Sequence, residues 1–211
     1  MNFIGGIDEA GRGPLIGPLI ICFCFTDRKN DRLLKKTGAT DSKILSPKRR
    51  EEIFEQLKTF CEFRIQEVTA KDLNKQMKTE SLNDIEARVM AEFVKNSQNC
   101  DIMIDMPDRY AWTFKERMNK FGASKFEAEH KADANYPIVG AASICAKITR
   151  DKKIQEIKND VGFDFGSGYP ADPKTKEAIN DKNKLEKLHN YIRWQWQTME
   201  NLKQKKLFED E

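Results

Sequence analysis

Two adjacent carboxylates near the start of the chain, Asp8 and Glu9, are the side chains best suited to chemistry. They follow the apolar pair Phe3-Ile4 and stand at the end of a predicted strand, where two acidic groups can hold a divalent metal ion. The segment Gly11-Arg12-Gly13 comes next, and its glycine backbone can approach a phosphate or a sugar closely. A lone Asp-Glu pair is usually part of a solvated turn. Combined with the glycines and the arginine, the pair indicates phosphodiester chemistry.

Two further carboxylates, Asp105 and Asp133, stand where they can join the first pair. Asp105 ends a short predicted strand over residues 101–105, and the ends of neighbouring strands converge in space. Asp133 precedes a helix that begins near Pro137, so it either caps that helix or joins a metal cluster. Four clustered carboxylates repel one another unless divalent cations neutralise them. Because all the ligands would be oxygens, the set favours Mg²⁺ or Mn²⁺ over zinc.

Composition and charge exclude several classes of protein. The 211 residues can form one catalytic body with a buried core. Charged residues make up 34% of the chain but the net charge is only +3, so a basic surface must come from local clusters such as the run from Lys174 to Lys206. The longest apolar run, residues 15–25, is interrupted by Gly17 and Pro18 and is too short to span a bilayer. We expect no membrane association.

The five cysteines lie mostly in apolar segments and are odd in number, which predicts buried, reduced thiols and a cytoplasmic protein. Cys22 and Cys24 would share one face of a strand. No second pair of Cys or His stands at zinc spacing, so the sequence does not favour a zinc site.

The hydrophobic patterns predict an α/β fold in which helices cover a mixed sheet. The predicted strands lie at residues 2–8, 15–25, 63–68, 101–105 and 124–129. Ser46-Pro47 predicts a helix start with Ser46 as the N-cap. Further helices are predicted at residues 82–97 and 111–121, after Pro137, and through much of 174–206. We therefore expect a catalytic domain over residues 1–173 and a helical extension over residues 174–211 that packs on the same domain.

Five blocks of sequence resemble, in order, the motifs of the type 2 ribonuclease H family, ribonuclease HII. They are Gly6–Pro14, Asp41-Ser42-Lys43, Ile104-Asp105, the stretch Asp133–Lys147, and Gly168–Thr175. The form of the last block, Gly-Tyr-Pro-Ala-Asp-Pro-Lys-Thr, is similar to the archaeal and eukaryotic branch of the family. Gly140 stands where the family more often has alanine.

The resemblance implies a ribonuclease H-like fold with a five-stranded mixed sheet flanked by helices. It also implies an endoribonuclease that hydrolyses the RNA strand of RNA/DNA hybrids. Such an enzyme cuts 5′ of ribonucleotides embedded in duplex DNA, with two metal ions, and leaves 3′-hydroxyl and 5′-phosphate ends. The catalytic metal ligands of the family carry over as Asp8, Glu9, Asp105 and Asp133. Asp8 would bridge both ions, Glu9 and Asp105 would complete the shells, and Asp133 would orient the ion that activates water.

The resemblance also implies the substrate contacts. RNA is distinguished from DNA through its 2′-hydroxyl, which in the family contacts the Gly11-Arg12-Gly13 backbone and Tyr169. Lys43, Ser143 and Lys147 would contact phosphates. The segment Gln204–Phe208 faintly resembles a peptide that binds a sliding clamp, which makes a clamp a possible partner. The length of the chain favours a monomer.

Two other functions stay open at the level of sequence. Gly11, Gly13 and Gly17 could form a dinucleotide-binding loop, but their spacing differs from that motif and Pro14 interrupts it. A catalytically silent nucleic-acid-binding subunit would keep the fold and lose its carboxylates, whereas all four are present here.

Overall fold

The computed structural model describes residues 2–97, 99–199 and 201, and these fall into two compact units. Unit 1 takes the described residues of Met1–Ala10, Ile20–Gln66 and Ser81–Thr149. Unit 2 takes those of Gly11–Leu19, Glu67–Glu80 and Arg150–Glu211. The expected division at residue 173 stays a prediction. No helix in the described part of the chain is long and apolar enough to cross a membrane.

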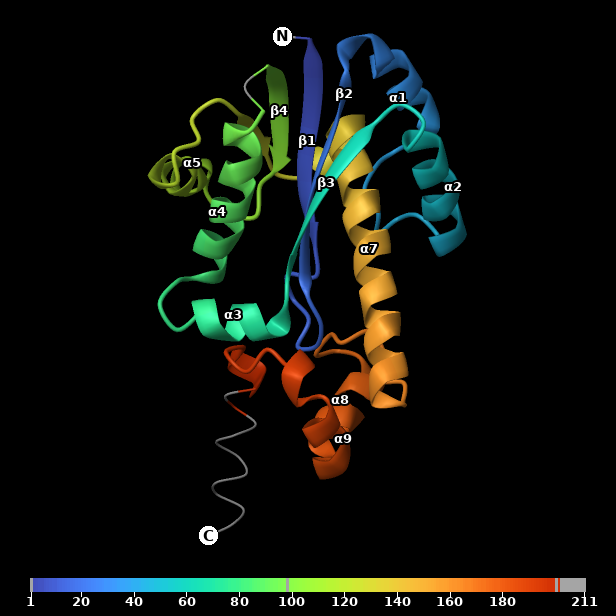
Figure 1. Cartoon of the computed structure of the whole chain (residues 1–211), viewed down its shortest axis with the longest axis vertical. Helices are drawn as coiled ribbons and strands as arrows, with labels where there is room; N and C mark the ends of the chain where they lie inside the picture. Colours follow the sequence, from blue (N-terminus) through green and yellow to red (C-terminus); the bar gives the residue numbers. More distant parts are fainter. Residues whose placement is uncertain (1, 98, 200, 202–211) are drawn as a thin grey trace. The chain divides into compact units, whose positions relative to one another are not determined.

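The strands form a five-stranded mixed sheet, as expected, in the order β3-β2-β1-β4-β5 (Figure 1). The strands are β1 (Phe3–Ala10), β2 (Leu19–Asp27), β3 (Glu62–Val68), β4 (Cys100–Asp105) and β5 (Glu127–Glu129). The central strand β1 pairs antiparallel with β2 and parallel with β4, and β4 pairs parallel with β5. The parallel register sets Ile7 beside Ile104, so the carboxyl ends of β1 and β4 lie next to each other.

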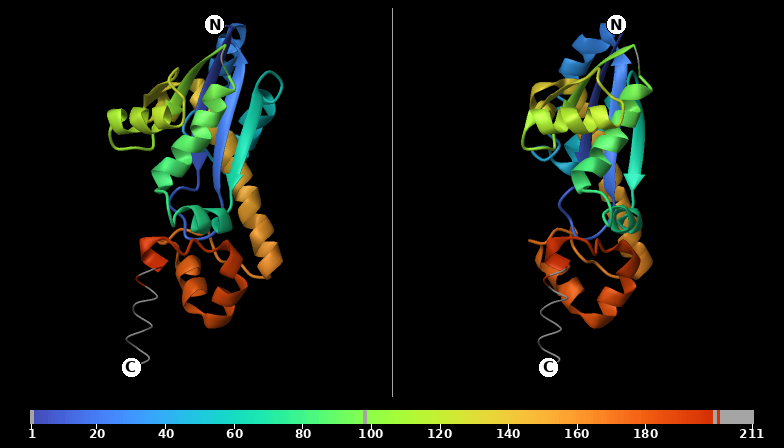
Figure 2. Two further views of the ribbon diagram at one scale, coloured as in Figure 1. Left: turned by 60° about the vertical axis from the view of Figure 1, so that its left-hand side comes forward. Right: turned by 90° about the vertical axis from the view of Figure 1, so that its left-hand side faces the viewer.

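In unit 1, helices cover both faces of this sheet (Figures 1 and 2). One face packs on α1 (Asp31–Thr37), α2 (Pro47–Leu57) and the first half of α7 (Pro137–Val161). The helices α4 (Leu82–Lys95) and α5 (Ala111–Lys120) lie on the other face, where Phe93 of α4 stacks on Phe23 of β2 at 5.8 Å between ring centroids.

The alternation of side chains along β2 assigns its residues to the two faces. Cys22 and Cys24 join the core that includes α7, while Phe23 between them faces α4. The prediction that the two cysteines share a face is therefore confirmed. All five cysteines are buried and not disulfide-bonded.

Local sequence signals account for several helix starts. Ser46 is the N-cap of α2 as predicted: its hydroxyl accepts a hydrogen bond from the Arg49 amide, and Pro47 occupies the first turn. Ser81 caps α4 in the same way. The helices α1 and α3 (Ala70–Gln76) were not expected from the hydrophobic pattern.

The predicted strand over residues 15–25 is wrong at its start. Leu15 and Ile16 are fully buried, but the chain turns at Gly17, whose φ of +92° favours glycine, and β2 begins only at Leu19. A buried apolar run is consistent with a strand or with a packed loop, and here Leu15 and Ile16 belong to the core of unit 2. The last strand, predicted over 124–129, is also shorter, since β5 covers only Glu127–Glu129.

Unit 2 is built around a separate apolar core. Leu15 and Ile16 pack there with the second half of α7, α8 (Pro173–Asn180) and the segment around Ile192. The charged tail that was predicted to be helical forms α8, α9 (Lys182–Lys187) and a 3₁₀ turn, His189–Tyr191. Asp181 stands between α8 and α9 and caps the second of them, because its carboxylate accepts a hydrogen bond from the Lys184 amide.

Candidate active site

Three of the four predicted carboxylates meet in unit 1. Asp8 lies inside β1, Asp105 is the last residue of β4, and Asp133 lies in the short helix α6 (Ala132–Asn135). One carboxylate oxygen from each lies within 4.8 Å of the others. Asp8 and Asp133 are buried and Asp105 is half-buried. The parallel pairing of β1 and β4 brings the first two together, as the strand-end argument predicts.

The connection from β5 to α6 brings in the third carboxylate. Lys131 adopts a left-handed conformation with a φ of +59°, which turns the chain into α6. The amide of Ala132 then donates a hydrogen bond of 2.8 Å to Oδ1 of Asp105. Asp133 is not a helix cap, because Lys131 is the N-cap of α6 and α7 begins only at Pro137. The capping interpretation of Asp133 is therefore wrong.

Glu9 lies outside the three residues whose carboxylate oxygens come within 4.8 Å of one another, and its role as a metal ligand stays a prediction. β1 continues to Ala10, so Asp8 and Glu9 both lie inside the strand, where successive side chains alternate between the two faces. The strand thus ends two residues later than the predicted strand over 2–8, and both acidic residues lie near its carboxyl end. Glu9 stays close enough to act electrostatically on Asp8, and its amide donates a hydrogen bond of 2.7 Å to Oδ1 of Asp8.

The pKa values of all three clustered carboxyls are raised. Burial is the largest cause for each of them. The charges of Glu9 and Asp105 raise the pKa of Asp8 further, and the charge of Asp105 does the same for Asp133. Such a set is disfavoured as three anions and fits a divalent cation, which would offset the repulsion. The donors are all oxygens, so the chemistry of the set suits Mg²⁺ or Mn²⁺.

Two predicted substrate contacts, Lys43 and Ser143, interact with this cluster. Although burial lowers the pKa of Lys43, the negative charges led by Asp8 raise it above the ordinary value. The hydroxyl of the buried Ser143 lies 3.0 Å from the hydroxyl of Ser42 and also hydrogen-bonds Asp8. Polar contacts therefore run from Ser42 through Ser143 to the carboxylate of Asp8. Lys147 lies one turn after Ser143 on α7 and is half-buried.

The other predicted contacts lie in unit 2: Gly11, Arg12 and Gly13 are on the loop that follows β1, and Tyr169 is in the segment before α8. Gly11 has a φ of +91°, and a Cβ there would lie 2.4 Å from Nε of Arg150. A Cβ on Gly13 would lie 3.6 Å from the ring of Tyr169, which is ordinary contact distance. The loop thus packs against Tyr169, whose exposed fraction is 39%. Only glycine fits at Gly11, because both the backbone conformation and the space exclude a side chain.

Two buried arginines donate hydrogen bonds to carbonyl groups of this loop. Neither was predicted from the sequence. Arg193 is fully buried and donates from Nε to the carbonyl of Gly17 at 2.8 Å and from Nη1 to the carbonyl of Arg12 at 3.3 Å. Arg150 donates from Nη2 to the carbonyl of Ile16 at 3.4 Å, and its guanidinium carbon lies 5.3 Å from the centroid of the Tyr169 ring. Each stands in a charged segment, where an arginine usually lies on a solvated face, so the sequence carried no signal for their burial.

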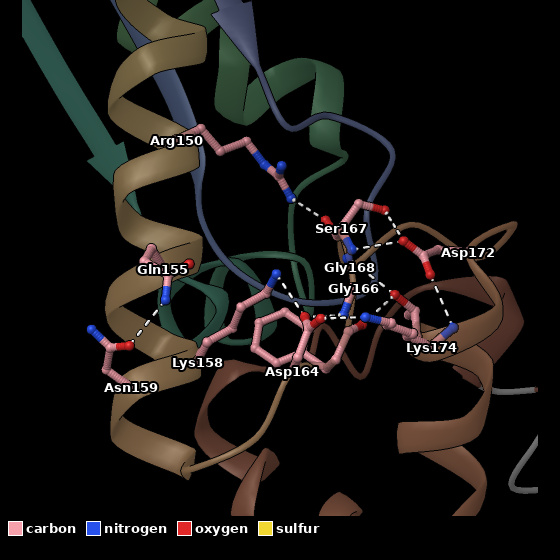
Figure 3. A network of polar contacts seen from close by, with 12 residues as sticks. Arg150, Gln155, Lys158, Asn159, Asp164, Gly166, Ser167, Gly168, Asp172 and Lys174 are labelled. Carbon is pink, nitrogen blue, oxygen red and sulfur yellow. Dashed lines mark hydrogen bonds and ion pairs between the residues drawn. The ribbon is translucent and has the colours of Figure 1, made fainter. Parts of the chain in front are cut away.

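The motif around Tyr169 is a network of polar contacts (Figure 3). Asp172 accepts hydrogen bonds from the amide and the hydroxyl of Ser167 and caps α8. The buried hydroxyl of Thr175 accepts from the amide of Gly168 and donates to the carbonyl of Phe165. Arg150 also donates to the carbonyl of Ser167. These residues have structural tasks, whereas the ring of Tyr169 is exposed.

The comparison with known proteins decides the family. Residues 5–199 match the family model for ribonuclease HII. The chain belongs to the ribonuclease HII family. Ribonuclease HII enzymes are metal-dependent endoribonucleases that act on RNA/DNA hybrids, and this chain is one of them. The resemblance to this family that the five motifs indicated is thus confirmed.

Sequence relatives and solved structures agree with this assignment. The ribonuclease HII of Archaeoglobus fulgidus is 37% identical over 202 residues, which cover 96% of this chain and 97% of the relative. The structure of a PCNA:RNase HII complex from the same organism matches with a TM-score of 0.83 and 34% identity, over 92% of this chain and 95% of that chain. The ribonuclease H2 of Pyrococcus horikoshii matches with a TM-score of 0.82 and 36% identity, over 96% and 98%.

Proposed function

We propose that Asp8, Asp105 and Asp133 form the metal-binding centre of this ribonuclease HII, and that Glu9 contributes from the neighbouring position on β1. The observation that carries the proposal is the meeting of three carboxylate oxygens within 4.8 Å, all on groups with raised pKa values. Bound Mg²⁺ or Mn²⁺ would supply a water of lowered pKa as nucleophile and offset the charge on the leaving 3′-oxygen.

The chain's own residues position the reacting groups. Ser143 holds the carboxylate of Asp8, and the amide of Ala132 holds that of Asp105, so neither side chain needs to reorganise when an ion binds. Lys43 carries a positive charge at the edge of the same cluster and is exposed, which suits a contact with a substrate phosphate. Lys147 is proposed as a second phosphate contact.

Recognition of a ribonucleotide is proposed for the loop and tyrosine of unit 2. Gly11 and Gly13 have no side chain, so the backbone on either side of Arg12 can approach a 2′-hydroxyl. The ring of Tyr169, held by Arg150 and adjoining Gly13, can pack on the next sugar. We therefore propose that the enzyme cuts on the 5′ side of a single ribonucleotide in duplex DNA.

An end-mapping experiment tests this finer specificity. An end-labelled DNA duplex with one ribonucleotide is incubated with the enzyme in Mg²⁺ and, as the control, in EDTA. We expect a single cut 5′ of the ribonucleotide in Mg²⁺ only, with a 3′-hydroxyl on the upstream product and a 5′-phosphate on the ribonucleotide. Cleavage of long RNA/DNA hybrids without cleavage of this duplex would contradict the proposal for single ribonucleotides and would leave the family assignment intact.

A sliding clamp is proposed as a protein partner, because the similar Archaeoglobus fulgidus ribonuclease HII was solved in a complex with PCNA. The segment predicted to bind it, Gln204–Phe208, lies outside the described residues. Size-exclusion chromatography with a purified archaeal clamp should show co-elution of the full chain and not of a chain that ends at residue 201. Independent elution of the full chain would contradict the proposal. A monomeric state and a cytoplasmic location stay predictions.

A further inference from the structure

Three residues that follow Asp105 in the chain form an exposed surface that the function described so far does not use. These residues, Arg109, Tyr110 and Trp112, are called the aromatic surface below. We infer that the aromatic surface binds the nucleic-acid substrate, contacting sugars and bases with its rings and a phosphate with its guanidinium. The inference rests on the proposed metal centre and extends the substrate-binding region beyond it.

The aromatic surface combines two large exposed rings with a cation. The exposed fraction of Trp112 is 67% and that of Tyr110 is 51%. The two rings lie nearly parallel, at 18°, with centroids 6.4 Å apart. The guanidinium carbon of Arg109 lies 5.3 Å from the centroid of the Tyr110 ring. An exposed, flat aromatic group beside a positive charge is the pattern by which proteins stack on nucleic-acid bases and hold their backbone.

The stability of α5 does not explain these side chains. The helix is anchored by the buried Phe114, which packs edge-to-face on Phe126 at 5.9 Å, and by the buried Met118. Tyr110 occupies the N-cap position but makes no side-chain capping hydrogen bond. Serine, threonine, aspartate or asparagine would cap the helix better there. Trp112 leaves most of its apolar area in water, where a polar residue would serve the helix as well.

Hydrogen bonds fix the aromatic surface to the segments that carry the carboxylates. The carbonyl of Arg109 lies 3.2 Å from Nε2 of His130, within hydrogen-bonding distance. The amide of Met106 donates to the carbonyl of Glu129 at 2.9 Å. The Ala132 amide, which follows in the same strand connection, donates to Asp105. The connection from β4 to α5 is therefore tied to the connection from β5 to α6, within one compact unit.

Charge and position identify nucleic acid as the occupant. The exposed residues of α5 include Lys115 and Lys120 against the single acidic residue Glu116, so the surroundings of the rings attract an anionic backbone. When the scissile phosphate of a substrate lies at the acidic cluster, the nucleotides on either side of that phosphate lie over the elements that surround the cluster. Leu33 of α1 is also exposed, at 49%, but its side chain has no ring that could stack on a base.

Equilibrium binding to a labelled RNA/DNA hybrid tests the inference, with Ca²⁺ in place of Mg²⁺ to prevent cleavage. The anisotropy of the label is measured for wild type, Trp112→Ala, Tyr110→Ala and Trp112→Phe, and Leu33→Ala is the matched exposed control in the same unit. We expect each alanine change at the aromatic surface to weaken binding about tenfold, which corresponds to about 1.4 kcal/mol. Trp112→Phe should restore most of the affinity because a ring remains, and Leu33→Ala should bind as wild type does.

Two further measurements separate this contact from a folding defect. The melting temperatures of the variants should match that of wild type, because both rings are exposed. Arg109→Gln should lower the slope of log affinity against log salt by about one, as expected for one phosphate contact. Wild-type affinity in Trp112→Ala and Tyr110→Ala would overturn the inference. If wild type cleaves the hybrid in Mg²⁺ and Asp8→Asn does not, the proposed metal centre stands and only the aromatic surface is rejected.

Discussion

At the scale of single residues, the clustered carboxylates of Asp8, Asp105 and Asp133 lower the stability of the folded chain when no cation is bound. Each of these carboxyls holds its proton more tightly in the folded chain than in the unfolded chain, because burial raises its pKa. The stability contributed by such a group is fully present below the pKa of an unfolded aspartate, about 3.9. It is lost as the pH rises through the raised value of the folded state.

The first prediction concerns the stability of the chain against pH. Without divalent cations, the melting temperature of wild type should fall as the pH rises above about 4, and Mg²⁺ should restore part of the loss at neutral pH. Asp133→Asn removes one of the mutually repelling charges, so it should melt at a higher temperature than wild type at neutral pH in EDTA. Thermal scans across pH, in EDTA and in Mg²⁺, make the comparison. A melting temperature of Asp133→Asn below that of wild type in EDTA would contradict this account of the cluster.

The second prediction concerns Tyr169, whose ring adjoins Gly13 and Arg150 in unit 2. Tyr169→Ala should depress cleavage of a duplex with a single ribonucleotide far more than it lowers the melting temperature. Tyr169→Phe should be milder because the ring survives. Initial rates on duplexes with one, four or no ribonucleotides test both variants. Equal rates for Tyr169→Ala and wild type on the single-ribonucleotide duplex would remove Tyr169 from recognition.

At the scale of elements, the loop over residues 11–18 depends on groups that no local pattern reveals. Arg193 donates to two carbonyls of the loop, while its own amide donates to the carbonyl of Leu15 at 2.9 Å. A lysine keeps the charge of Arg193 but cannot reproduce the planar fork that reaches two acceptors. Each buried carbonyl left without its donor costs about 1–3 kcal/mol.

The third prediction follows for Arg193→Lys. The variant should lose about 1–3 kcal/mol of stability for each buried carbonyl that its side chain no longer satisfies. Its rate on the single-ribonucleotide duplex should fall more than its rate on a long hybrid, because the loop is displaced while the carboxylates of unit 1 are untouched. Lys176→Ala, an exposed change on α8, is the control. A parallel fall on both substrates would assign Arg193 to stability alone.

The same elements show what the sequence could predict. Ser46-Pro47 predicted the start of α2, and the apolar spacing of residues 82–97 predicted α4, because cap chemistry and helical periodicity are local. The start of β2 was misjudged, because Leu15 and Ile16 are buried in a loop. The burial of Arg150 and Arg193 depends on carbonyls distant in the sequence. The end of β1 was also misjudged, since the strand runs to Ala10 and not to Asp8.

At the scale of the whole molecule, the two units carry different parts of the proposed chemistry. Unit 1 holds the acidic cluster and unit 2 holds the loop with Tyr169, and the peptide bond between Ala10 and Gly11 joins β1 directly to that loop. Family resemblance supplied the candidate residues, and the sheet topology explains why residues as far apart in sequence as Asp8 and Asp133 meet. The fold class could be predicted from the motifs and the strand pattern, whereas the division into two units could not.

Cleavage of a uniform RNA/DNA hybrid by wild type, Asp8→Asn and Asp105→Asn, in saturating Mg²⁺ and in EDTA, tests the central claim most directly. A neutral amide is a poor ligand for a divalent cation and does not offset its charge, so both variants should fold and yet lose activity by orders of magnitude. Wild type should lose its activity in EDTA and regain it when Mg²⁺ is restored. Activity near the wild-type level in either folded variant, or full activity of wild type in EDTA, would contradict a metal centre built on these carboxylates.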